Sequence, residues 1–421
     1  MFKYCLLFLL SLIISTELPQ GLTEWEKNNM HLIEEMRFRT DPPPGPIRSI
    51  AEYEPMQGVL IRYPFGISTS LIREMAEDVI IYCLVSSGLQ NSAYNSMNNA
   101  GVNMNNVEFI TGSTNSYWTR DYGPWWVVDG DGVYSIVDFT YNRPRPADNQ
   151  APLKVANHMG VPYYSADFVA TGGNYMTDGT GISAATHIAY TENNECNTNN
   201  QSSVPLPPCA YVDAIMDDYY GIDTFHVVAD PNGEYIDHID CWGKYLSPSK
   251  VLIRSVPTSN SQYQEIEEVA NYFASTLTSD GIPWQVYRVY TPSDQPYTNS
   301  LILNDKVFVP MMNSGWDDDA IEVYQEAMPG YEILGFTGSW ESTDALHCRV
   351  KGIPDISYVP YESGDVNTDE TVNIQDVVLI INYILDLIDF DDNQFSLADL
   401  NDDSSINIQD VILLVNVVLD N

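Results

Sequence analysis

Three short segments carry residue types that could act together in covalent chemistry. They contain Asp121 in YWTRDYGPWW, His238 and Asp240 in EYIDHIDCWGK, and Cys348 in DALHCRVKGIPD. A cysteine with a histidine elsewhere in the chain is a candidate nucleophile and base. Carboxylates near a thiol raise its pKa, which is a disadvantage unless the substrate carries a positive charge. A guanidinium group is such a substrate, because it is planar, permanently charged and matched by carboxylates.

The spacing of His238 and Asp240 predicts that both side chains act at one place. Residues two apart in a strand point to the same face of the sheet. Taken singly, an aspartate is more often a cap, a histidine a structural residue and a cysteine part of the core. The prediction of a catalytic site therefore depends on the combination of the four side chains.

The elements that position these side chains are predicted to form an α/β domain over residues 47–360. Short apolar runs such as GVLIRYP, DVIIYCLV, KVLIRSV and KVFVPMM alternate with helical stretches such as TSLIREMAE and YQEIEEVANYFASTL. This alternation is typical of α/β domains with many short strands. Residues 21–46 precede the domain, and a helix is expected from Glu24 to Arg39. The sequence DPPPGP from Asp41 to Pro46 ends it, because proline cannot continue a helix.

Four motifs of the domain occur in the order found in a known family. WTRDYGP, TGGN, HIDCWGK and LHCRVKG resemble the agmatine deiminase and bacterial (Porphyromonas-type) peptidylarginine deiminase family, over nearly the whole domain. EYIDHID, LHCR and Arg-Pro-Arg are more similar to the peptidylarginine branch. The resemblance implies a pentein fold, a five-bladed α/β propeller with the site at its centre. It also implies catalysis without a cofactor.

The resemblance assigns a role to each residue of the motifs. Cys348 is the nucleophile, and His238 is the acid and base that protonates the departing ammonia and then activates water. Asp121 and Asp240 clamp the guanidinium nitrogens, and a covalent thiouronium intermediate follows. The remaining residues expected to contact the substrate are Trp118, Asp178, Tyr235 and Ile236.

Two arginines in TYNRPRPADN bear on the choice of substrate. Arg143 and Arg145 would repel a diamine such as agmatine, but they fit the α-carboxylate of a C-terminal arginine. Agmatine deiminases carry Glu before the Gly-Gly-Asn segment, whereas this chain has Thr171. We therefore expect an enzyme that converts arginine, preferably at the C-terminus of peptides or proteins, to citrulline. The alternative functions are an agmatine or free-arginine deiminase and a non-catalytic arginine-binding protein. The alternative role for Arg143 and Arg145 is a salt-bridging surface turn.

The composition changes after Tyr361. From there to Asn421 the chain has no Lys or Arg and 14 acidic residues, and GDVNTDETVNIQDVVLIINYIL is repeated as ADLNDDSSINIQDVILLVNVVL. Oxygen-bearing side chains stand at loop positions 1, 3, 5, 7, 9 and 12, a spacing that suits calcium. The predicted ligands are Asp365, Asn367, Asp369, Thr371, Asn373 and Asp376, and then Asp399, Asn401, Asp403, Ser405, Asn407 and Asp410.

The doubled loop followed by an apolar helix resembles a dockerin, a small all-α pair of EF-hand-like loops spanning residues 361–421. A cohesin-like partner is implied, and an intramolecular or purely stabilising role is the alternative. Position 6, normally Gly, is Glu370 and Ser404, so a lower calcium affinity is expected. An acidic helical hairpin without metal is the other interpretation.

The N-terminus predicts export. Residues 1–20 read as a signal peptide, with Lys3 before the apolar run from Leu6 to Ser15. No later run is long enough to span a membrane. Cys196 and Cys209 bracket a polar loop and suit a local disulfide in an oxidising compartment. The net charge of −40 disfavours nucleic acid as a partner. We expect a secreted protein, attached to a surface if the C-terminal module finds a partner.

Overall fold

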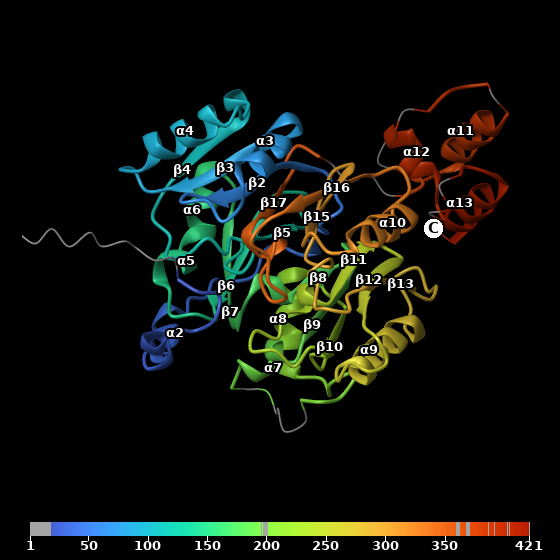
Figure 1. Cartoon of the computed structure of the whole chain (residues 1–421). Coiled ribbons are helices and arrows are strands. Elements are labelled where there is room, and N and C mark those ends of the chain that lie inside the picture. Colours follow the sequence, from blue (N-terminus) through green and yellow to red (C-terminus); the bar gives the residue numbers. More distant parts are fainter. Residues whose placement is uncertain are drawn as a thin grey trace, which may run out of the picture. The chain divides into compact units, whose positions relative to one another are not determined.

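The computed structural model of the chain contains two compact units, Met1–Asp355 and Ile356–Asn421 (Figure 1). It describes residues 18–194, 196, 201–358, 363–367, 371–385, 387–390, 392–401, 403 and 405–420. Most of the predicted signal peptide lies outside these residues. Among the described helices, none is both long and apolar enough to cross a membrane.

The larger unit repeats one arrangement of strands and helix. In each of five sheets a first strand pairs antiparallel with a second, and the second pairs parallel with a third. Parallel neighbours cannot be joined by a tight turn. A helix therefore connects the second strand to the third in every sheet.

The first of these sheets joins the two ends of the unit. Strand β17 (Lys351–Pro354) pairs with β2 (Met56–Arg62), which leads through α3 (Thr69–Asp78) to β3 (Ile80–Val85). Helix α4 (Gln90–Asn99) and the 3-10 turn η1 (Met104–Asn106) continue to β4 (Val107–Thr111), which lies parallel to β3. The ends of the unit therefore meet within one sheet.

The other four sheets follow in chain order. Their elements are β5 (Trp125–Val128), β6 (Tyr134–Tyr141), α6 (Ala151–Met159) and β7 (Tyr163–Ala170); β8 (Met176–Thr177), β9 (Ile182–Thr186), α8 (Ala210–Tyr220) and β10 (Thr224–Val228); β11 (Gly243–Ser247), β12 (Lys250–Ser255), α9 (Tyr263–Ser275) and β13 (Gln285–Tyr290); and β14 (Leu301–Leu303), β15 (Lys306–Met311), α10 (Asp317–Ala327) and β16 (Glu332–Thr337). The short strand β1 (Arg48–Ser49) extends the β5 sheet. Short helices α5 (Pro146–Asn149) and α7 (Ile188–Thr191) lie in the connections.

The apolar runs of the sequence form these strands because their side chains are buried on both faces. Val251 and Ile253 of β12, for example, pack against Val269 and Phe273 of α9. The core is accordingly divided into several clusters, each between a sheet and its helices. The mixed α/β architecture predicted from the alternation of runs is confirmed.

The N-terminal segment differs from the predicted single helix. It forms two short helices, α1 (Glu24–Lys27) and α2 (His31–Met36). The side chains of Asn28 and Asn29 donate to the backbone oxygens of Glu24 and Trp25, 2.6 and 2.7 Å away. Such contacts compete with the helical hydrogen bonds, so the helix stops at these residues.

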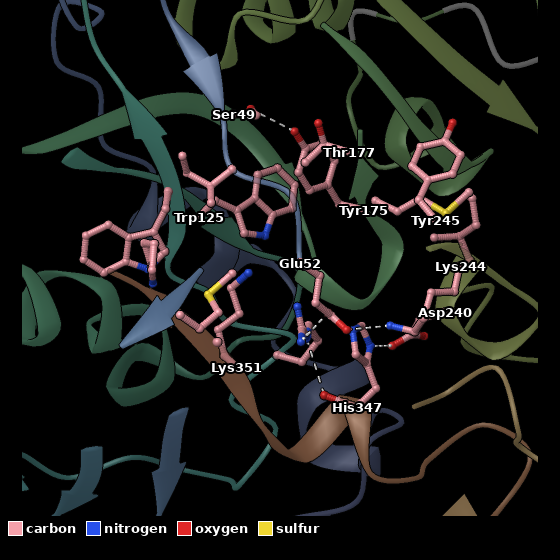
Figure 2. Close-up of a pocket in the computed structure, with 18 of the residues that line it drawn as sticks. Ser49, Glu52, Trp125, Tyr175, Thr177, Asp240, Lys244, Tyr245, His347 and Lys351 are labelled. Atoms are coloured by element: carbon pink, nitrogen blue, oxygen red, sulfur yellow. Dashed lines mark hydrogen bonds and ion pairs between the residues drawn. The ribbon is translucent and has the colours of Figure 1, made fainter. Parts of the chain in front are cut away.

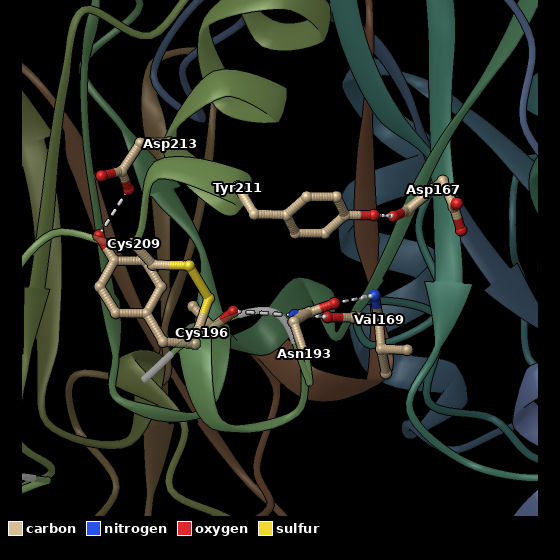
Figure 3. The surroundings of a disulfide bond; sticks show 9 residues. Asp167, Val169, Asn193, Cys196, Cys209, Tyr211 and Asp213 are labelled. Atoms are coloured by element: carbon tan, nitrogen blue, oxygen red, sulfur yellow. Dashed lines mark hydrogen bonds between the residues drawn. A yellow bond between two sulfur atoms is a disulfide. The ribbon is translucent and has the colours of Figure 1, made fainter. Parts of the chain in front are cut away.

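The predicted disulfide between Cys196 and Cys209 is present (Figure 3). It ties the connection after α7 to the start of α8. Asn193 also bonds both backbone groups of Val169 in β7, at 2.9 and 3.0 Å. Cys196 is thereby tied to the start of α8 and Asn193 to the neighbouring strand β7.

The smaller unit contains helices α11 (Ile374–Ile384), α12 (Asp392–Ala398) and α13 (Ile408–Asp420). Val366, Ile380, Ala398 and Leu414 are buried together and form its core. The two apolar runs of the repeat thus become two helices that share one core.

Candidate active site

The functional side chains occupy equivalent positions in successive repeats of the strand and helix arrangement. Asp121, Asp240 and Cys348 each lie two to four residues before the first strand of a sheet, at β5, β11 and β17. Asn299 stands in the same place before β14, and the 3-10 turn η2 (Gly172–Asn174) before β8. Residues more than two hundred positions apart therefore converge.

Cys348 is fully buried in the 3-10 turn η4 (His347–Arg349). Its Sγ lies 3.8 Å from Oδ2 of Asp240 and 3.3 Å from Nδ2 of Asn299. The Oδ1 atom of Asn299 accepts from the backbone N–H of Cys348 at 3.3 Å. The asparagine thus holds both the thiol and its backbone.

His238 and Asp121 lie against each other, with 3.6 Å between Nδ1 and Oδ1. Both side chains are buried. A Cβ atom on Gly173 would lie 2.6 Å from Nδ1 of His238 and 2.7 Å from Oδ1 of Asp121. The second glycine of TGGN is therefore required for the two side chains to share this space.

The predicted strand around His238 and Asp240 is wrong. His238 is extended, but the 3-10 turn η3 (Ile239–Cys241) contains Asp240. Asp237 before them has a positive φ of 53°, which ends any regular strand. The turn, and not the alternation of a strand, brings both side chains to the site.

Asp240 is held by a buried group of charges that the sequence prediction missed (Figure 2). Nδ1 of His347 lies 2.7 Å from Oδ2 of Asp240, and Nε2 lies 2.5 Å from Oε2 of Glu52. Glu52 also pairs with Arg120 and Lys244, each at 2.7 Å. Because both ring nitrogens of His347 face carboxyl oxygens, the ring carries two protons or shares one with a carboxyl group.

A cavity of about 60 Å³ lies beside this group of charges. Strands β1, β5, β8, β11 and β17 all contribute to its wall, together with Asp240 and His347 (Figure 2). Cys348, His238 and Asp121 do not line it. The cavity is therefore separate from the face of the site on which a substrate must meet the thiol.

Burial and charge set the protonation states of the site. Burial, then the charges of Asp240 and Asp121, raise the pKa of the Cys348 thiol well above its ordinary value. Burial, then Asp240, raises the pKa of Asp121 to about 8. Burial lowers the pKa of His238 to about 3. For Asp240 the contacts from His347 outweigh burial, so its pKa is lowered.

At neutral pH the Cys348 thiol, the His238 imidazole and the Asp121 carboxyl are therefore uncharged, whereas Asp240 is ionised. The site contains no thiolate–imidazolium pair. A bound cation would favour ionisation of both Asp121 and Cys348, because a nearby positive charge stabilises their anions. The arrangement suits a substrate that brings its own positive charge.

The structure brings Trp118 and Arg143 to the site. Trp118 is buried, and the guanidinium of Arg349 lies 5.6 Å from its ring centroid. The charge of Arg143 lowers the pKa of both Asp121 and His238. Arg145 is buried next to it and pairs with Glu26 of α1, with 2.6 Å between Nε and Oε1.

Tyr235 and Ile236 lie three and two residues before His238. Tyr235 is 65% exposed and Ile236 is buried. The structure does not bring Asp178 to the thiol. Its carboxylate accepts from the backbone N–H groups of Thr180 and Ile182 at 2.8 and 2.9 Å. These bonds close the turn between β8 and β9, and a carboxylate occupied in this way is a turn residue.

The described part of the C-terminal loops holds buried carboxylates. Asp365, Asp376 and Asp410 are fully buried. Asp376 accepts from the backbone N–H groups of Asn367 and Asn373 at 3.0 and 2.9 Å, and Asp410 accepts from Leu400 and Asn407 at 3.1 and 2.8 Å.

Of the other predicted calcium ligands, the structure describes Thr371, Asp399, Asn401, Asp403 and Ser405, whereas Asp369 lies outside the described residues. The two residues at loop position 6, Glu370 and Ser404, lie outside them as well. Within the described residues no three His, Cys, Asp or Glu side chains are grouped as a metal site.

A buried thiol between two carboxylates, with a histidine and an asparagine in reach, defines a cysteine site built for a planar cationic group. Comparisons with known proteins agree. The family described as Porphyromonas-type peptidyl-arginine deiminase matches residues 49–354. The chain belongs to this family, as its motifs predicted. The dockerin type I domain matches residues 363–419, which confirms the second resemblance.

Individual relatives are more distant. Agmatine deiminase of Medicago truncatula is 24% identical over 305 residues, which cover 59% of this chain and 79% of that protein. Among solved structures, agmatine deiminase of Enterococcus faecalis has a TM-score of 0.64 at 18% identity, over 75% of this chain and 100% of that one. Agmatine deiminase of C. jejuni has a TM-score of 0.59 at 17% identity, over 73% of this chain and 96% of that one. At these identities the structures establish the fold alone.

Proposed function

We propose that this chain is a peptidylarginine deiminase, which hydrolyses the guanidinium group of arginine to citrulline and ammonia. The observation that carries the proposal is the placement of the Cys348 thiol against Asp240 and near Asp121. The cationic side chain of Arg143 is close enough to act on Asp121. Two carboxylates match one guanidinium, and an arginine at a distance matches the oxygen of a peptide backbone or carboxylate.

These positions support the following reaction. Asp121 and Asp240 hold the guanidinium nitrogens and direct its carbon toward Sγ. As the substrate's charge enters, the thiol gives its proton to His238, and Sγ bonds to the carbon. His238 protonates the departing amino group, which leaves as ammonia and gives a thiouronium. His238 then takes a proton from water, whose oxygen displaces the sulfur, leaving citrulline and the restored thiol.

Arg143 favours a peptide over agmatine. Its Nε donates to a backbone carbonyl oxygen, that of Gln20, at 3.1 Å. Agmatine carries a second cation in place of this acceptor, and the charge of Arg143 would repel it. Thr171, rather than an acid, stands before the Gly-Gly-Asn turn. An agmatine or free-arginine deiminase remains the second candidate, because the named relatives include agmatine deiminases.

A C-terminal arginine is the preferred substrate in this proposal. Its α-carboxylate would take the place of the carbonyl oxygen now bound to Arg143 and would add a charge to that contact. Arg145 contributes less, because its guanidinium is already paired with Glu26.

The remaining predictions complete the proposal. The five sheets are the blades of a pentein propeller, and the first strands of four of them, β5, β8, β11 and β17, line the central cavity. The C-terminal loops bind calcium, for which oxygen donors at regular spacing and buried carboxylates in a segment without Lys or Arg are suited. The module docks to a cohesin-like partner and places an exported enzyme at a surface.

One assay tests the central claim. Purified protein is incubated with agmatine, free arginine, and peptides with internal, C-terminal or amidated arginine, and citrulline and ammonia are measured. Cys348→Ala must remove the activity, whereas Cys83→Ala must keep it, because Cys83 is an equally buried free cysteine in β3. If no guanidine compound yields ammonia, the proposal is wrong. Conversion of agmatine alone would favour the second candidate.

A further inference from the structure

A segment of the chain itself, Pro19–Gly21, lies against Arg143 and Arg145 beside the site. Gln20 is 3% exposed. Its carbonyl oxygen accepts from Nε of Arg143 at 3.1 Å. Its side chain lies close enough to the Asp121 carboxyl to lower that group's pKa. Gln20 therefore contacts Arg143 and lies next to Asp121, one of the two carboxylates proposed to bind the guanidinium.

The backbone on either side of Gln20 is also fixed. Nη2 of Arg145 donates to the carbonyl oxygens of Pro19 and Gly21, at 2.6 and 3.3 Å. Gly21 lies under the ring of Tyr235, since a Cβ atom there would be 2.8 Å from Cε2 of the ring. Three consecutive carbonyls are thus held by two arginines, as the backbone of a bound peptide would be.

Helix α1 anchors this segment from its C-terminal side. Thr23 and Glu26 form a capping box, in which the backbone N–H of Thr23 donates to Glu26 at 2.7 Å. Glu26 also pairs with Arg145, at 2.6 and 3.4 Å. The same carboxylate therefore joins the start of the helix to the arginine that holds Pro19 and Gly21.

The side chain of Gln20 has the chemistry of an inert substitute for arginine. A glutamine amide is planar, but it ends two bonds short of the guanidinium carbon of an arginine. Both of its polar side-chain atoms are buried, and the amide approaches Asp121 without forming a hydrogen bond of good geometry. An amide has one acceptor and two donors, whereas carboxylates match the all-donor guanidinium. Gln20 therefore occupies the site without satisfying it.

We propose that Pro19–Gln20–Gly21 is a pseudosubstrate that a true substrate must displace, and that Arg143 and Arg145 form a subsite for the backbone carbonyls of a peptide. The identity of the displacing substrate rests on the proposed function, but the position of Pro19–Gly21 against Arg143 and Arg145 does not. The segment competes with substrate within the molecule, so the apparent Michaelis constant is the intrinsic constant divided by the fraction of molecules in which the segment has left the site.

The first experiment measures access to Cys348. The whole chain is expressed and exported, and N-terminal sequencing verifies that the exported protein starts at or before Pro19. This protein is treated with a haloacetamidine, a small cationic alkylating agent. Gln20→Ala is expected to speed labelling about tenfold, because it removes the side chain that lies against Asp121. Glu24→Gln is the matched control, since Glu24 is exposed on α1 and pairs only with Lys27 among the described contacts. Cys348→Ala gives the background from other cysteines.

Equal labelling rates in the wild type, Gln20→Ala and Glu24→Gln would overturn the proposal, whatever the enzyme's substrate. So would an exported chain that begins after Gln20. Faster labelling in Gln20→Ala alone supports it.

The second experiment turns the pseudosubstrate into a substrate. In Gln20→Arg the guanidinium carbon stands two bonds further along the side chain than the amide carbon of glutamine, which on this proposal brings it within reach of Sγ of Cys348. Water adds and ammonia leaves, so citrulline is expected at position 20 in peptide mass spectra, at a rate independent of protein concentration. Gln20→Lys, which has no amidine, and Gln20→Arg combined with Cys348→Ala remain unchanged. If the Gln20→Arg protein converts added peptides but leaves its own position 20 unmodified, the proposal is refuted. If added peptides are not converted either, the proposed function fails, and the labelling rates alone decide on the pseudosubstrate.

Discussion

Replacing Arg143 by alanine is expected to reduce the preference for a free C-terminal carboxylate. In the structure its Nε holds a neutral carbonyl oxygen at 3.1 Å. A carboxylate at this place would make a charge-assisted contact, whose loss costs roughly 1.5–3 kcal/mol, against roughly 0.5–1.5 kcal/mol for a neutral one. At tenfold per 1.4 kcal/mol, the Michaelis constant rises roughly 10- to 150-fold for peptides ending in arginine and roughly 2- to 12-fold for the amidated peptides.

The assay compares citrulline formation from the two peptides under identical conditions. Their ratio is the informative quantity, because release of the Pro19–Gly21 segment in the variant changes both constants by the same factor. Arg143→Lys keeps the charge without the planar fork and should fall between wild type and Arg143→Ala. A ratio that stays unchanged in Arg143→Ala would refute the assignment of this residue to the α-carboxylate.

Other outcomes follow from the same site. Cys348→Ala should abolish citrulline formation and leave the thermal unfolding temperature within a few degrees, and residual turnover would contradict the covalent mechanism. Because the pKa of Asp121 is raised to about 8, its carboxyl is protonated below that pH, so kcat/KM should fall about tenfold per unit as pH drops below 8. A flat profile would contradict this. Glu52→Gln should lower kcat more than it raises KM, because His347 then orients Asp240 less firmly; an unchanged kcat would exclude that role. Chelation should unfold residues 364–421 without stopping catalysis, and calorimetry without calcium uptake would refute the calcium sites.

The sequence predicted the parts of the site that carry reactive side chains. Cysteine, histidine and aspartate in distinctive motifs were recognisable, and Cys348, His238 and Asp240 do meet. Asn299 was not predicted, because one asparagine before a short strand is typical of an ordinary turn. Its repeated position before the first strand of a sheet was the available signal.

Local geometry that residue types do not encode accounts for the other differences. Asp178 was predicted to contact the substrate, and in the structure its carboxylate closes its own turn. The alternation at His238 and Asp240 suggested a strand, although a positive φ at Asp237 precedes a 3-10 turn. Gln20 was assigned to the signal peptide, and only the folded chain places it against Arg143.

The protonation states connect these findings. A site with a neutral thiol and a protonated Asp121 has little reactivity of its own, because burial and the charge of Asp240 oppose a second anion. A guanidinium changes this balance, since its charge stabilises the carboxylate and the thiolate together. The neutral amide of Gln20 fills the same space without supplying that charge. In the proposed mechanism the substrate's own charge would both displace the segment and activate the thiol, which would confine the chemistry to molecules that carry a guanidinium.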